Sequence, residues 1–470
     1  MKRIAIILTL CSIIGTGKNI FGQQATVMYF MKDNPLQHNF NPAFQPERNF
    51  YFGFPVLSSL NISAGNNSLI FADVFYGRTI DGKKQTVSFL HPEVKGGVDN
   101  FLNSLRKNTR FYAEFSATLL SFGLRHNKSY YTFDVSTRAE GQFMLPESVP
   151  ALFFRGVEDK EGETEFNLRS LSFSATAYTQ IALGSSYNYD KQWNFGAKLK
   201  ILLGHANLDG YCGDMSLKVS KERWLLQGES SLYGTVPGLE FKKKDDYTFD
   251  GMSFDGGNKS LFSGVGLAGD LGATFNFFES LRFSASVVDI GFIHWNKNIH
   301  KTNKENDFEF EGITYDINND SIDYWEEYRN MLEGMYVVER DPKSYSTMLT
   351  AKIYAGAEYS ILKDRLGFGL LSKTYIAKKE WFQDFIVSVN YRPFRPLAVS
   401  ANYSLLNGKW SNIGFGMNVN AGPVNLFVCA DNIPLKFAKG GGMMIPTNTK
   451  MTSVSFGINF MFGREKTDAE

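Results

Sequence analysis

The chain has 470 residues, with 49 Lys plus Arg against 48 Asp plus Glu, so its net charge gives no support for a nucleic-acid partner. It contains 42 Phe, 22 Tyr and 43 Gly, yet its mean hydropathy is slightly negative at -0.22. A soluble protein this aromatic would have a more apolar average, whereas half of every strand in a transmembrane barrel is polar.

The first 22 residues are typical of a secretory signal peptide. Lys2 and Arg3 precede an apolar core, "IAIILTLCSIIGTG", that is too short to span a bilayer as a helix. Cleavage is predicted after Gly22, and Leu10 before Cys11 does not fit a lipidation site. No later run of about 18 apolar residues occurs, so the exported chain is periplasmic, secreted or an outer-membrane barrel.

Residues 23–48 lack sustained alternation of apolar and polar side chains. They contain three prolines, which disfavour pairing in a central strand, and two Asn-Pro pairs that favour turns. A large barrel encloses a lumen that wall side chains alone do not fill. We therefore predict that this segment is a plug held by inward polar groups such as Lys198 and Arg282, with a disordered periplasmic tail as the alternative.

From residue 49 to residue 463 the sequence repeats a pattern of period two. Each segment sets an apolar face against a small or polar face, over about the 9–11 residues that a tilted transmembrane strand needs. The clearest examples are 170–184, 194–204, 397–406, 412–420 and 452–463. The sequence therefore predicts an all-β fold, an antiparallel transmembrane β-barrel, followed by a periplasmic tail at 464–470.

The expected connections alternate between short and long. The short or moderate ones are 189–192, 205–210, 220–223, 278–280, 362–365, 393–396, 407–411 and 421–422, and the long ones include 145–165, 237–260, 296–346 and 432–450. Transmembrane barrels have this asymmetry, with short turns on the periplasmic side and longer loops outside. The segments number about sixteen, and fourteen strands is the alternative.

Two helices are expected within the connections, at 98–108 and at 320–334. In residues 316–327, Asp316, Asn318 and Asp320 stand at the first three ligand positions of a calcium loop and Glu327 stands at its twelfth residue. Ser321 stands where that loop needs a glycine. We interpret the segment as a polar loop that leads into a capped helix, with a weak calcium site as the alternative.

The segment "GVGLAG" resembles a dinucleotide-binding motif. Gly264, Gly266 and Gly269 fit G-x-G-x-x-G, and Asp289 follows twenty residues later. Such a site needs a helix directly after the glycines, whereas the sequence continues with period two as far as Phe277. We therefore predict a strand here and no nucleotide site.

Catalytic constellations are not evident in the sequence. Cys212 and Cys429 remain after signal removal and are interpreted as isolated residues, with a disulfide as the alternative. The six histidines show neither clustered metal spacing nor a Ser-centred nucleophile elbow. We therefore expect no enzyme, no metal site and no cofactor.

Eight charged residues fall opposite the apolar strand faces. On the lipid side a basic residue would cost about 2–4 kcal/mol near the midplane, so all eight should line the lumen. They are Glu114, Asp134, Arg138, Lys198, Lys200, Arg282, Lys352 and Glu358. Because opposite charges in a confined lumen pair, we favour an internal salt-bridge network over a polar conduit.

The last strand should act as the assembly signal. In "TSVSFGINFMFG" (452–463), Phe456, Phe460 and Phe462 share one face with other apolar residues, and small or polar residues form the other. We predict that the phenylalanines face lipid and that the barrel-assembly machinery recognises this strand. The expected partners are therefore that machinery and outer-membrane lipid, with no nucleic acid.

The motif Asn41-Pro42-Ala43-Phe44, followed by "FYFGFPVLSSL", resembles the opening of an uncharacterised family of Bacteroidota outer-membrane barrel proteins. The resemblance extends more loosely over nearly the whole mature chain and implies an outer-membrane location without an activity. An Asn-Pro-Ala near the N-terminus also occurs in long-chain fatty-acid transporter barrels and in type IX secretion barrels. The longer transporter signature around that motif is missing here.

Three functions remain after these steps. The first is a porin-like channel or transporter that moves a small molecule, with a hydrophobic one among the candidate substrates, across the outer membrane. The second is a non-conducting scaffold whose long loops hold secretion or surface-protein partners. The third is an outer-membrane lipid-modifying enzyme.

Overall fold

The computed structural model describes residues 26–156, 163–220, 223–255, 260–304, 307–310, 333–377, 380–406, 409–433, 437–440, 443–446 and 451–463. The signal peptide, the calcium-like loop at 316–327 and the tail at 464–470 lie outside the described residues, as does the helix expected at 320–334 apart from its last two residues. No helix within the described ranges is long and apolar enough to cross a membrane.

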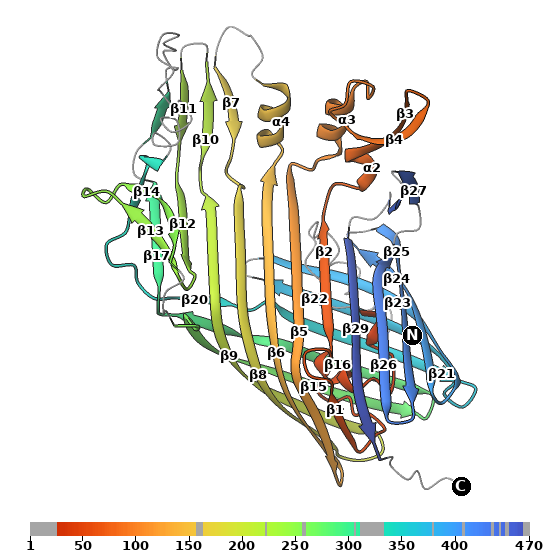
Figure 1. Ribbon diagram of the computed structural model, residues 1–470. Helices are drawn as coiled ribbons and strands as arrows, with labels where there is room; N and C mark the ends of the chain where they lie inside the picture. Colours follow the sequence, from red (N-terminus) through yellow and green to blue (C-terminus); the bar gives the residue numbers. More distant parts are fainter. Residues whose placement is uncertain are drawn as a thin grey trace, which may run out of the picture.

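The described strands close into an antiparallel barrel with fourteen strand positions (Figure 1). Neighbours around the barrel follow the order of the chain, which is the up-and-down arrangement. The wall consists of β1 (Phe50–Gly53) with β2 (Leu60–Asn66), β5 (Asn108–His126), β6 (Ser129–Pro146), β8 (Ser172–Asn188), β9 (Trp193–Cys212), β15 (Gly264–Phe278), β16 (Leu281–Trp295), β21 (Ala351–Ile361), β22 (Leu366–Ala377), β23 (Glu380–Phe394), β24 (Leu397–Leu406), β25 (Lys409–Ala421), β26 (Val424–Ile433) and β29 (Met451–Phe462).

The first strand position is interrupted. β1 and β2 both pair with β29 on one side and with β5 on the other, so together they close the barrel. Between them residues 54–59 bulge out of the ladder, yet the Phe54 amide donates to the Ile458 carbonyl at 3.0 Å and the Ile458 amide donates to the Leu57 carbonyl at 2.9 Å. The wall therefore stays hydrogen-bonded across the interruption.

The alternation of the last strand is confirmed. Phe456 and Phe462 of β29 are 40% and 47% exposed on the outer face, whereas Ser455 and Asn459 are buried on the inner face. The same division holds on β15, where Leu267 is about half exposed. The outer face of the wall is therefore apolar and its inner face is small or polar.

Six short turns lie at one end of the barrel, which we call the short-turn end, and the opposite end is the long-loop end. The short turns are 127–128, 189–192, 279–280, 362–365, 395–396 and 422–423. The C-terminal end of β29 also lies at the short-turn end (Figure 1). This agrees with the predicted asymmetry between short and long connections.

Fourteen is the second of the two expected counts, and the difference has a local cause. Residues 205–210, expected as a connection, are the continuation of β9, which runs on past a bulge at His205. The connection at 220–223 is short as expected, but it joins β10 to β11 at the long-loop end. Two segments that were counted as wall strands therefore belong to structure above the barrel.

The remaining elements stand at the long-loop end (Figure 1). They include a four-stranded sheet, β18-β11-β10-β7, and three separate hairpins. They are α2 (Phe71–Val74), β3 (Phe75–Ile80), β4 (Lys83–Ser88), α3 (Gly97–Ser104), α4 (Ser148–Arg155), β7 (Thr164–Asn167), β10 (Ser216–Val219), β11 (Trp224–Gln227), β12 (Ser230–Thr235), β13 (Leu239–Lys243), β14 (Phe249–Phe254), β17 (Ile299–Lys304), β18 (Phe308–Phe310), β19 (Tyr336–Val338), β20 (Tyr345–Met348), β27 (Phe437–Gly440) and β28 (Met443–Pro446). α3 confirms the helix expected at 98–108.

The glycine-rich segment at residues 264–269 is a strand, as predicted. It opens β15, which pairs with β9 and β16 along its length, and no helix follows its glycines. A β-carbon on Gly264 would lie 2.7 Å from the Trp295 ring, so that glycine makes room for a large inward side chain. Cys212 and Cys429 are both free thiols, which confirms their interpretation as isolated residues.

Candidate functional site

Residues 26–49 lie inside the barrel at its short-turn end, and we call this segment the plug (Figure 1). It contains two short 3-10 helices, η1 (Thr26–Met28) and η2 (Pro35–Asn39). Most of its side chains are buried although it forms no strand of the wall. The structure therefore places this segment in the lumen, as the plug hypothesis expects.

Local sequence shapes the plug. The Asn34 side chain caps η2 by accepting from the Leu36 amide at 3.0 Å, and Pro35 at the first helical position has no amide hydrogen to satisfy. The Gln37 amide group then donates to the Tyr29 carbonyl at 2.8 Å, which ties η2 back to the first part of the plug. The plug is thus a compact insert rather than an extended tail.

Apolar packing holds the plug to the wall. Tyr29 is fully buried, and its ring stacks on Tyr354 of β21 at 5.6 Å between centroids. Burial raises the pKa of Tyr29 to about 12, although its hydroxyl bonds Ser284 at 3.1 Å. The apolar cluster joins Val27, Met28, Tyr29, Phe30, Met31, Leu36, Phe40 and Phe44 of the plug to Tyr51, Tyr130, Val288, Tyr354, Leu371, Ile386, Ala398, Phe427, Cys429 and Met461 of the wall.

Wall glycines make pockets for two large apolar side chains of the plug, Phe30 and Met31. A β-carbon on Gly369 of β22 would lie 2.6 Å from the Phe30 ring, and one on Gly416 of β25 would lie 2.6 Å from the Met31 methyl group. A side chain at either position would therefore occupy space that the plug now fills. These pockets belong to the inner wall.

The Asn41-Pro42-Ala43-Phe44 motif is the turn by which the plug touches the wall. The Asn41 side chain donates to the Ala273 and Ala285 carbonyls at 3.3 and 3.2 Å, and its oxygen accepts from the Ala43 amide at 2.9 Å. A β-carbon on Gly196 would collide with Pro42, and one on Gly272 would collide with Asn41. The motif therefore requires glycine on the two facing strands, β9 and β15.

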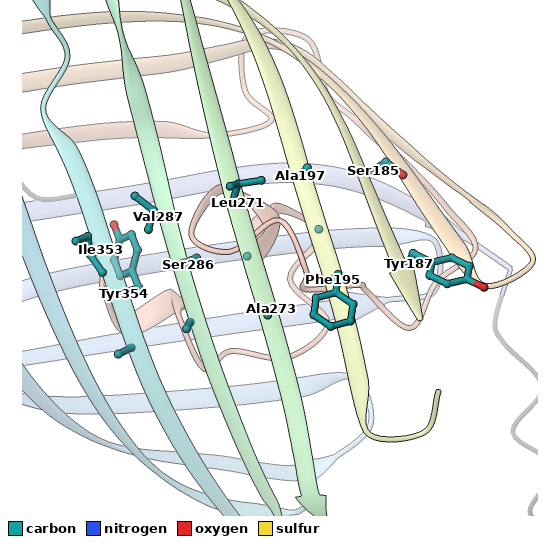
Figure 2. A pocket seen from close by; sticks show the side chains of 14 residues that line it. Ser185, Tyr187, Phe195, Ala197, Leu271, Ala273, Ser286, Val287, Ile353 and Tyr354 are labelled. Carbon is teal, nitrogen blue, oxygen red and sulfur yellow. The ribbon is translucent and has the colours of Figure 1, made fainter. Parts of the chain in front are cut away.

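On the outer face of the same strands lies a hollow of about 710 Å³ (Figure 2). Its apolar lining includes Phe195, Leu271 and Ile353, and small residues lie between them. Gly196 and Gly272 line this hollow and also meet the plug from inside. The wall therefore carries few side-chain atoms on either face where the motif touches it.

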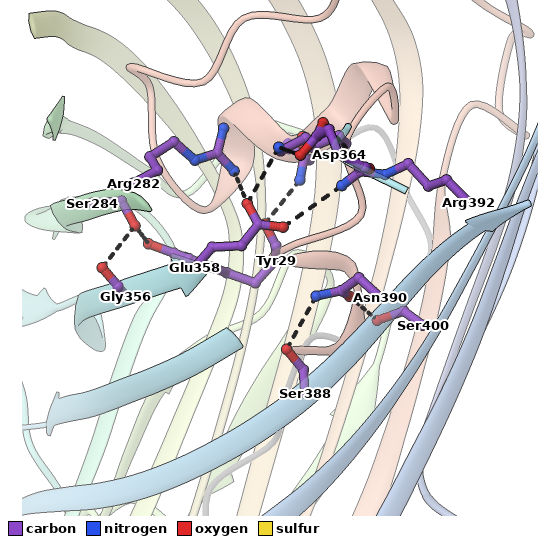
Figure 3. Close-up of polar contacts among 12 residues, drawn as sticks. Tyr29, Arg282, Ser284, Gly356, Glu358, Asp364, Ser388, Asn390, Arg392 and Ser400 are labelled. Carbon is purple, nitrogen blue, oxygen red and sulfur yellow. Dashed lines mark hydrogen bonds and ion pairs between the residues drawn. The ribbon is translucent and has the colours of Figure 1, made fainter. Parts of the chain in front are cut away.

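Ion pairs hold the plug at the short-turn end (Figure 3). The Lys32 ammonium lies 2.6 Å from the Asp364 carboxylate, which also accepts from Arg392 at 2.6 Å. Arg282 pairs with the buried Glu358 at 2.9 Å. Burial lowers the pKa of Lys32, and the nearby Glu358 carboxylate opposes that effect.

The turn that carries Asp364 is conformationally strained. Leu362, Lys363 and Asp364 have φ values of 56°, 54° and 66°, which non-glycine residues rarely adopt in succession. The ion pairs of Asp364 to Lys32 and Arg392 stabilise this conformation. The plug and the turn therefore support each other.

A second set of charged residues lies above the plug, towards the long-loop end, and we call it the charged layer. Its members are Glu114, Arg138, Glu140, Lys200, Asp270, Asp289 and Lys352. Lys200 lies 2.7 Å from Asp270 and 2.6 Å from Asp289, and Asp289 also pairs with Arg138 at 3.0 Å. All of these side chains come from the wall.

Little space remains within the charged layer. Part of it surrounds a cavity of about 10 Å³, close to the smallest space that holds one water. Opposite charges fill the lumen beside that cavity, as the favoured salt-bridge hypothesis expects.

The structure separates the eight predicted lumen residues into two groups. Asp134, Lys198, Arg282 and Glu358 lie beside the plug, and Glu114, Arg138, Lys200 and Lys352 belong to the charged layer. The Lys198 ammonium bonds the Asn39 side chain of the plug at 2.8 Å, and the Arg282 guanidinium lies 5.2 Å from the Phe44 ring. Both contacts agree with the predicted role of Lys198 and Arg282.

Asp270 and Asp289 also line the lumen, although they were not among the eight predicted lumen residues. The Asp289 amide donates to the Asp270 carboxylate at 2.8 Å, where β16 bulges and Asp289 takes a positive φ of 62°. Before the bulge the odd-numbered residues of β16 face out. After the bulge the even-numbered Ile290 and Phe292 face out instead. The break in alternation within "VVDIGF" (287–292) is the sequence feature that could have indicated an inward-facing Asp289.

Comparison with known proteins gives a family and a set of distant structures. A family model described as "Family of unknown function (DUF5723)" matches residues 42–431. No curated protein matches the sequence. Similar solved structures are the Pseudomonas putida toluene transporter TodX (9% identity, TM-score 0.40, 93% of this chain and 94% of that chain), a Pseudomonas aeruginosa FadL homologue (10%, 0.43, 95% and 100%) and the translocator domain of autotransporter NalP from Neisseria meningitidis (7%, 0.34, 93% and 97%). At these identities and TM-scores the likeness assigns no function.

Proposed function

Since the chain belongs to the DUF5723 family, whose description assigns no function, we propose one from the geometry of the lumen. We propose that the protein is an outer-membrane barrel that admits a small hydrophobic molecule when its plug moves aside. The observation that carries this proposal is the set of glycine pockets that hold Phe30 and Met31 against the inner wall.

These pockets give the lumen an affinity for apolar groups. Phe30 and Met31 are almost fully buried, and burying a side chain of this size stabilises by about 1.5–3 kcal/mol. A plug that moved would expose the same apolar surface, so a small hydrophobic molecule could take the place of these side chains. An ionic solute would gain nothing there.

The charged layer and the apolar pockets lie on different parts of the wall. The paired charges come from β5, β6, β9, β15, β16 and β21. The glycine pockets lie on β22 and β25, together with Leu371, Ile386 and Phe427 of the apolar cluster. A molecule that followed β22–β26 would therefore pass beside the ion pairs of the charged layer, and it would meet the buried Lys373, Asp384 and Asp431 on its own side of the wall.

The apolar outer face supports the proposed outer-membrane location. Leu183, Leu199, Leu271 and Val265 lie on three neighbouring strands and are each at least half exposed. A continuous apolar band of this kind would be costly in water and is expected of a barrel surrounded by lipid.

A disulfide that locks the plug tests the proposal. A β-carbon on Gly416 lies 3.0 Å from a Val27 methyl carbon, so Val27→Cys with Gly416→Cys, in a Cys429→Ala background, has geometry compatible with a disulfide. We expect cells with the oxidised protein to take up the apolar fluorophore N-phenyl-1-naphthylamine no faster than cells that lack the protein. Chemical reduction of the disulfide should restore the uptake. The Gly416→Cys single variant in the same background is the control, because a side chain at residue 416 by itself occupies space that Met31 fills.

Equal uptake by the oxidised and reduced forms would contradict a passage that depends on plug movement. A scaffold function then becomes the better account, because the four-stranded sheet at the long-loop end has its own apolar cluster of Leu168, Met215, Leu217 and Val219. An ordered platform of this kind suits a surface partner. Single-channel conductance that is absent from both forms would support the same conclusion.

A further inference from the structure

His38 of the plug is the start of a buried hydrogen-bond chain that reaches the wall. Its Nε2 lies 2.7 Å from the Tyr51 hydroxyl of β1, which lies 3.0 Å from the Ser121 hydroxyl of β5. Ser121 donates to the Asp134 carboxylate of β6 at 2.6 Å. All four side chains are at most 3% exposed, so water does not screen the chain.

The direction of these bonds fixes the tautomer of His38. The single hydroxyl hydrogen of Ser121 goes to Asp134, so Ser121 can only accept from Tyr51. The hydrogen of Tyr51 is then used, and its oxygen must accept from Nε2–H of His38. His38 is therefore neutral, with the proton on Nε2 and a bare Nδ1.

The bare Nδ1 faces a carboxylate that is already occupied. It lies 3.7 Å from Asp134 Oδ2 and has no hydrogen-bond partner among the described residues. The same oxygen accepts from the Lys198 ammonium at 3.1 Å. A second ammonium, that of Lys200, lies two residues farther along β9. A proton on Nδ1 would thus be buried beside the Lys198 ammonium, which already occupies the same carboxylate oxygen, and near the Lys200 ammonium, which pairs with Asp270 and Asp289.

We propose that His38 is an acid-sensitive latch, and that protonation of its Nδ1 releases the plug from the wall. The ionisable groups facing it are Tyr51 of β1, Asp134 of β6, and Lys198 and Lys200 of β9, and Tyr130 of β6 stacks behind Tyr51 at 6.4 Å. Among these only Asp134 favours the charged imidazole. Burial and both lysines oppose it.

The sign of the pH effect follows from this environment. Burial, and next the charge of Lys198, lowers the pKa of His38 from 6.5 to about 3 in the docked plug. In a released plug the imidazole meets water and regains its ordinary pKa. Docking is therefore at full strength above pH 6.5 and weakens as the pH falls towards 3, by roughly 30-fold at pH 5.

Accessibility of a plug thiol measures the latch. We would place a cysteine at Leu36, which is 1% exposed, in the full-length protein with Cys212→Ser and Cys429→Ala, and follow its reaction with 4,4'-dithiodipyridine. This reagent reacts with thiols in acid as well as at neutral pH. We expect a rate at pH 5 at least ten times that at pH 7.5, after correction with the same protein unfolded in urea.

His38→Gln keeps a donor for Tyr51 and cannot titrate, so its rate should be the same at both pH values after that correction. His91→Gln, which changes a histidine of the loop at the long-loop end, should behave as the parent does. If His38→Gln does not fold, Tyr51→Phe serves instead, because it should expose the thiol already at pH 7.5.

An equal rate at both pH values in the parent, or an acid response that persists in His38→Gln, would overturn the latch. The consequence for permeation rests on the proposed function, whereas thiol accessibility does not. Acid release without any change in probe uptake would therefore support the latch and contradict the proposed passage.

Discussion

The lumen has two layers. In the first, which we call the plug layer, the plug packs against the wall through apolar side chains. In the charged layer, side chains of the wall itself reach across the lumen and pair. Phe30 occupies a pocket at Gly369, and Lys200 binds Asp270 and Asp289 from neighbouring strands. We expect that the first arrangement can be removed without breaking the wall, because none of the described wall strands begins before Phe50. The second is part of the wall, so its loss should cost the stability of the barrel itself.

Both layers depend on a barrel that reaches the membrane, so the largest effect should come from the outer face of β29. We expect Phe460→Asp with Phe462→Asp to abolish outer-membrane insertion, because both carboxylates would face lipid and the predicted assembly signal would be lost. The measurement is the amount of heat-modifiable protein in outer-membrane fractions. Ser453→Asp with Ser455→Asp, on the inner face of the same strand, is the matched control for added charge and should be less damaging.

Within an assembled barrel, breaking the charged layer should have the next largest effect. Lys200→Met leaves Asp270 and Asp289 short of a partner, and removal of one member of a buried ion group costs about 3–5 kcal/mol. We expect the urea midpoint of the refolded barrel to fall accordingly, as followed by tryptophan fluorescence. Lys128→Met, at an exposed short turn, should leave the midpoint nearly unchanged.

The second half of this test is a rescue. Asp270→Asn added to Lys200→Met removes the uncompensated carboxylate and should recover part of the lost stability. A Lys200→Met barrel as stable as the parent would show that the charged layer does not hold the wall together.

Removing the plug should affect permeability rather than stability. We expect deletion of residues 25–46 to leave a heat-modifiable barrel, since none of the described wall strands begins before Phe50. Conductance in planar bilayers, or cellular sensitivity to large antibiotics, should rise. Normal assembly with unchanged permeability would mean that the segment does not close the lumen.

A single methyl group should produce the smallest effect, and only in the plug layer. Gly272→Ala places a β-carbon against Asn41, so we expect the plug to loosen by about 1–3 kcal/mol while the barrel remains assembled. Faster proteolysis of the plug would report this. Gly269→Ala, on the same strand, meets nothing closer than a Lys198 carbonyl at 3.6 Å and should resemble the parent.

The wall could be predicted from the sequence because its faces alternate with period two over most of each strand. The phenylalanines of β29 face out and Ser455 and Asn459 face in, as the pattern alone requires. The pattern failed where β9 runs on through residues 205–210, because "HANLDG" has turn-forming residues although its neighbours β8 and β12 supply ladder partners. Tertiary pairing overrode local preference there.

The lumen was harder to predict, because its contacts join residues far apart in sequence. Eight charged residues could be placed from their strand faces, but their division between plug and charged layer depends on which strands neighbour which. His38 carried no signal in the sequence, since its importance comes from Tyr51 and Asp134. The need for glycine at Gly196 and Gly272 is likewise visible only once the plug is in place.

The seam where the first strand meets the last also determines how the plug can move. Arg125 of β5 donates to Gln45 at 2.7 Å and to the Pro46 carbonyl at 2.5 Å, and β1 begins only a few residues later. The C-terminal end of the plug is therefore tethered to the closing strand. A plug that moves without opening the seam must pivot about residues 45–49, so Thr26 at its other end travels farthest and the Asn41 turn travels least.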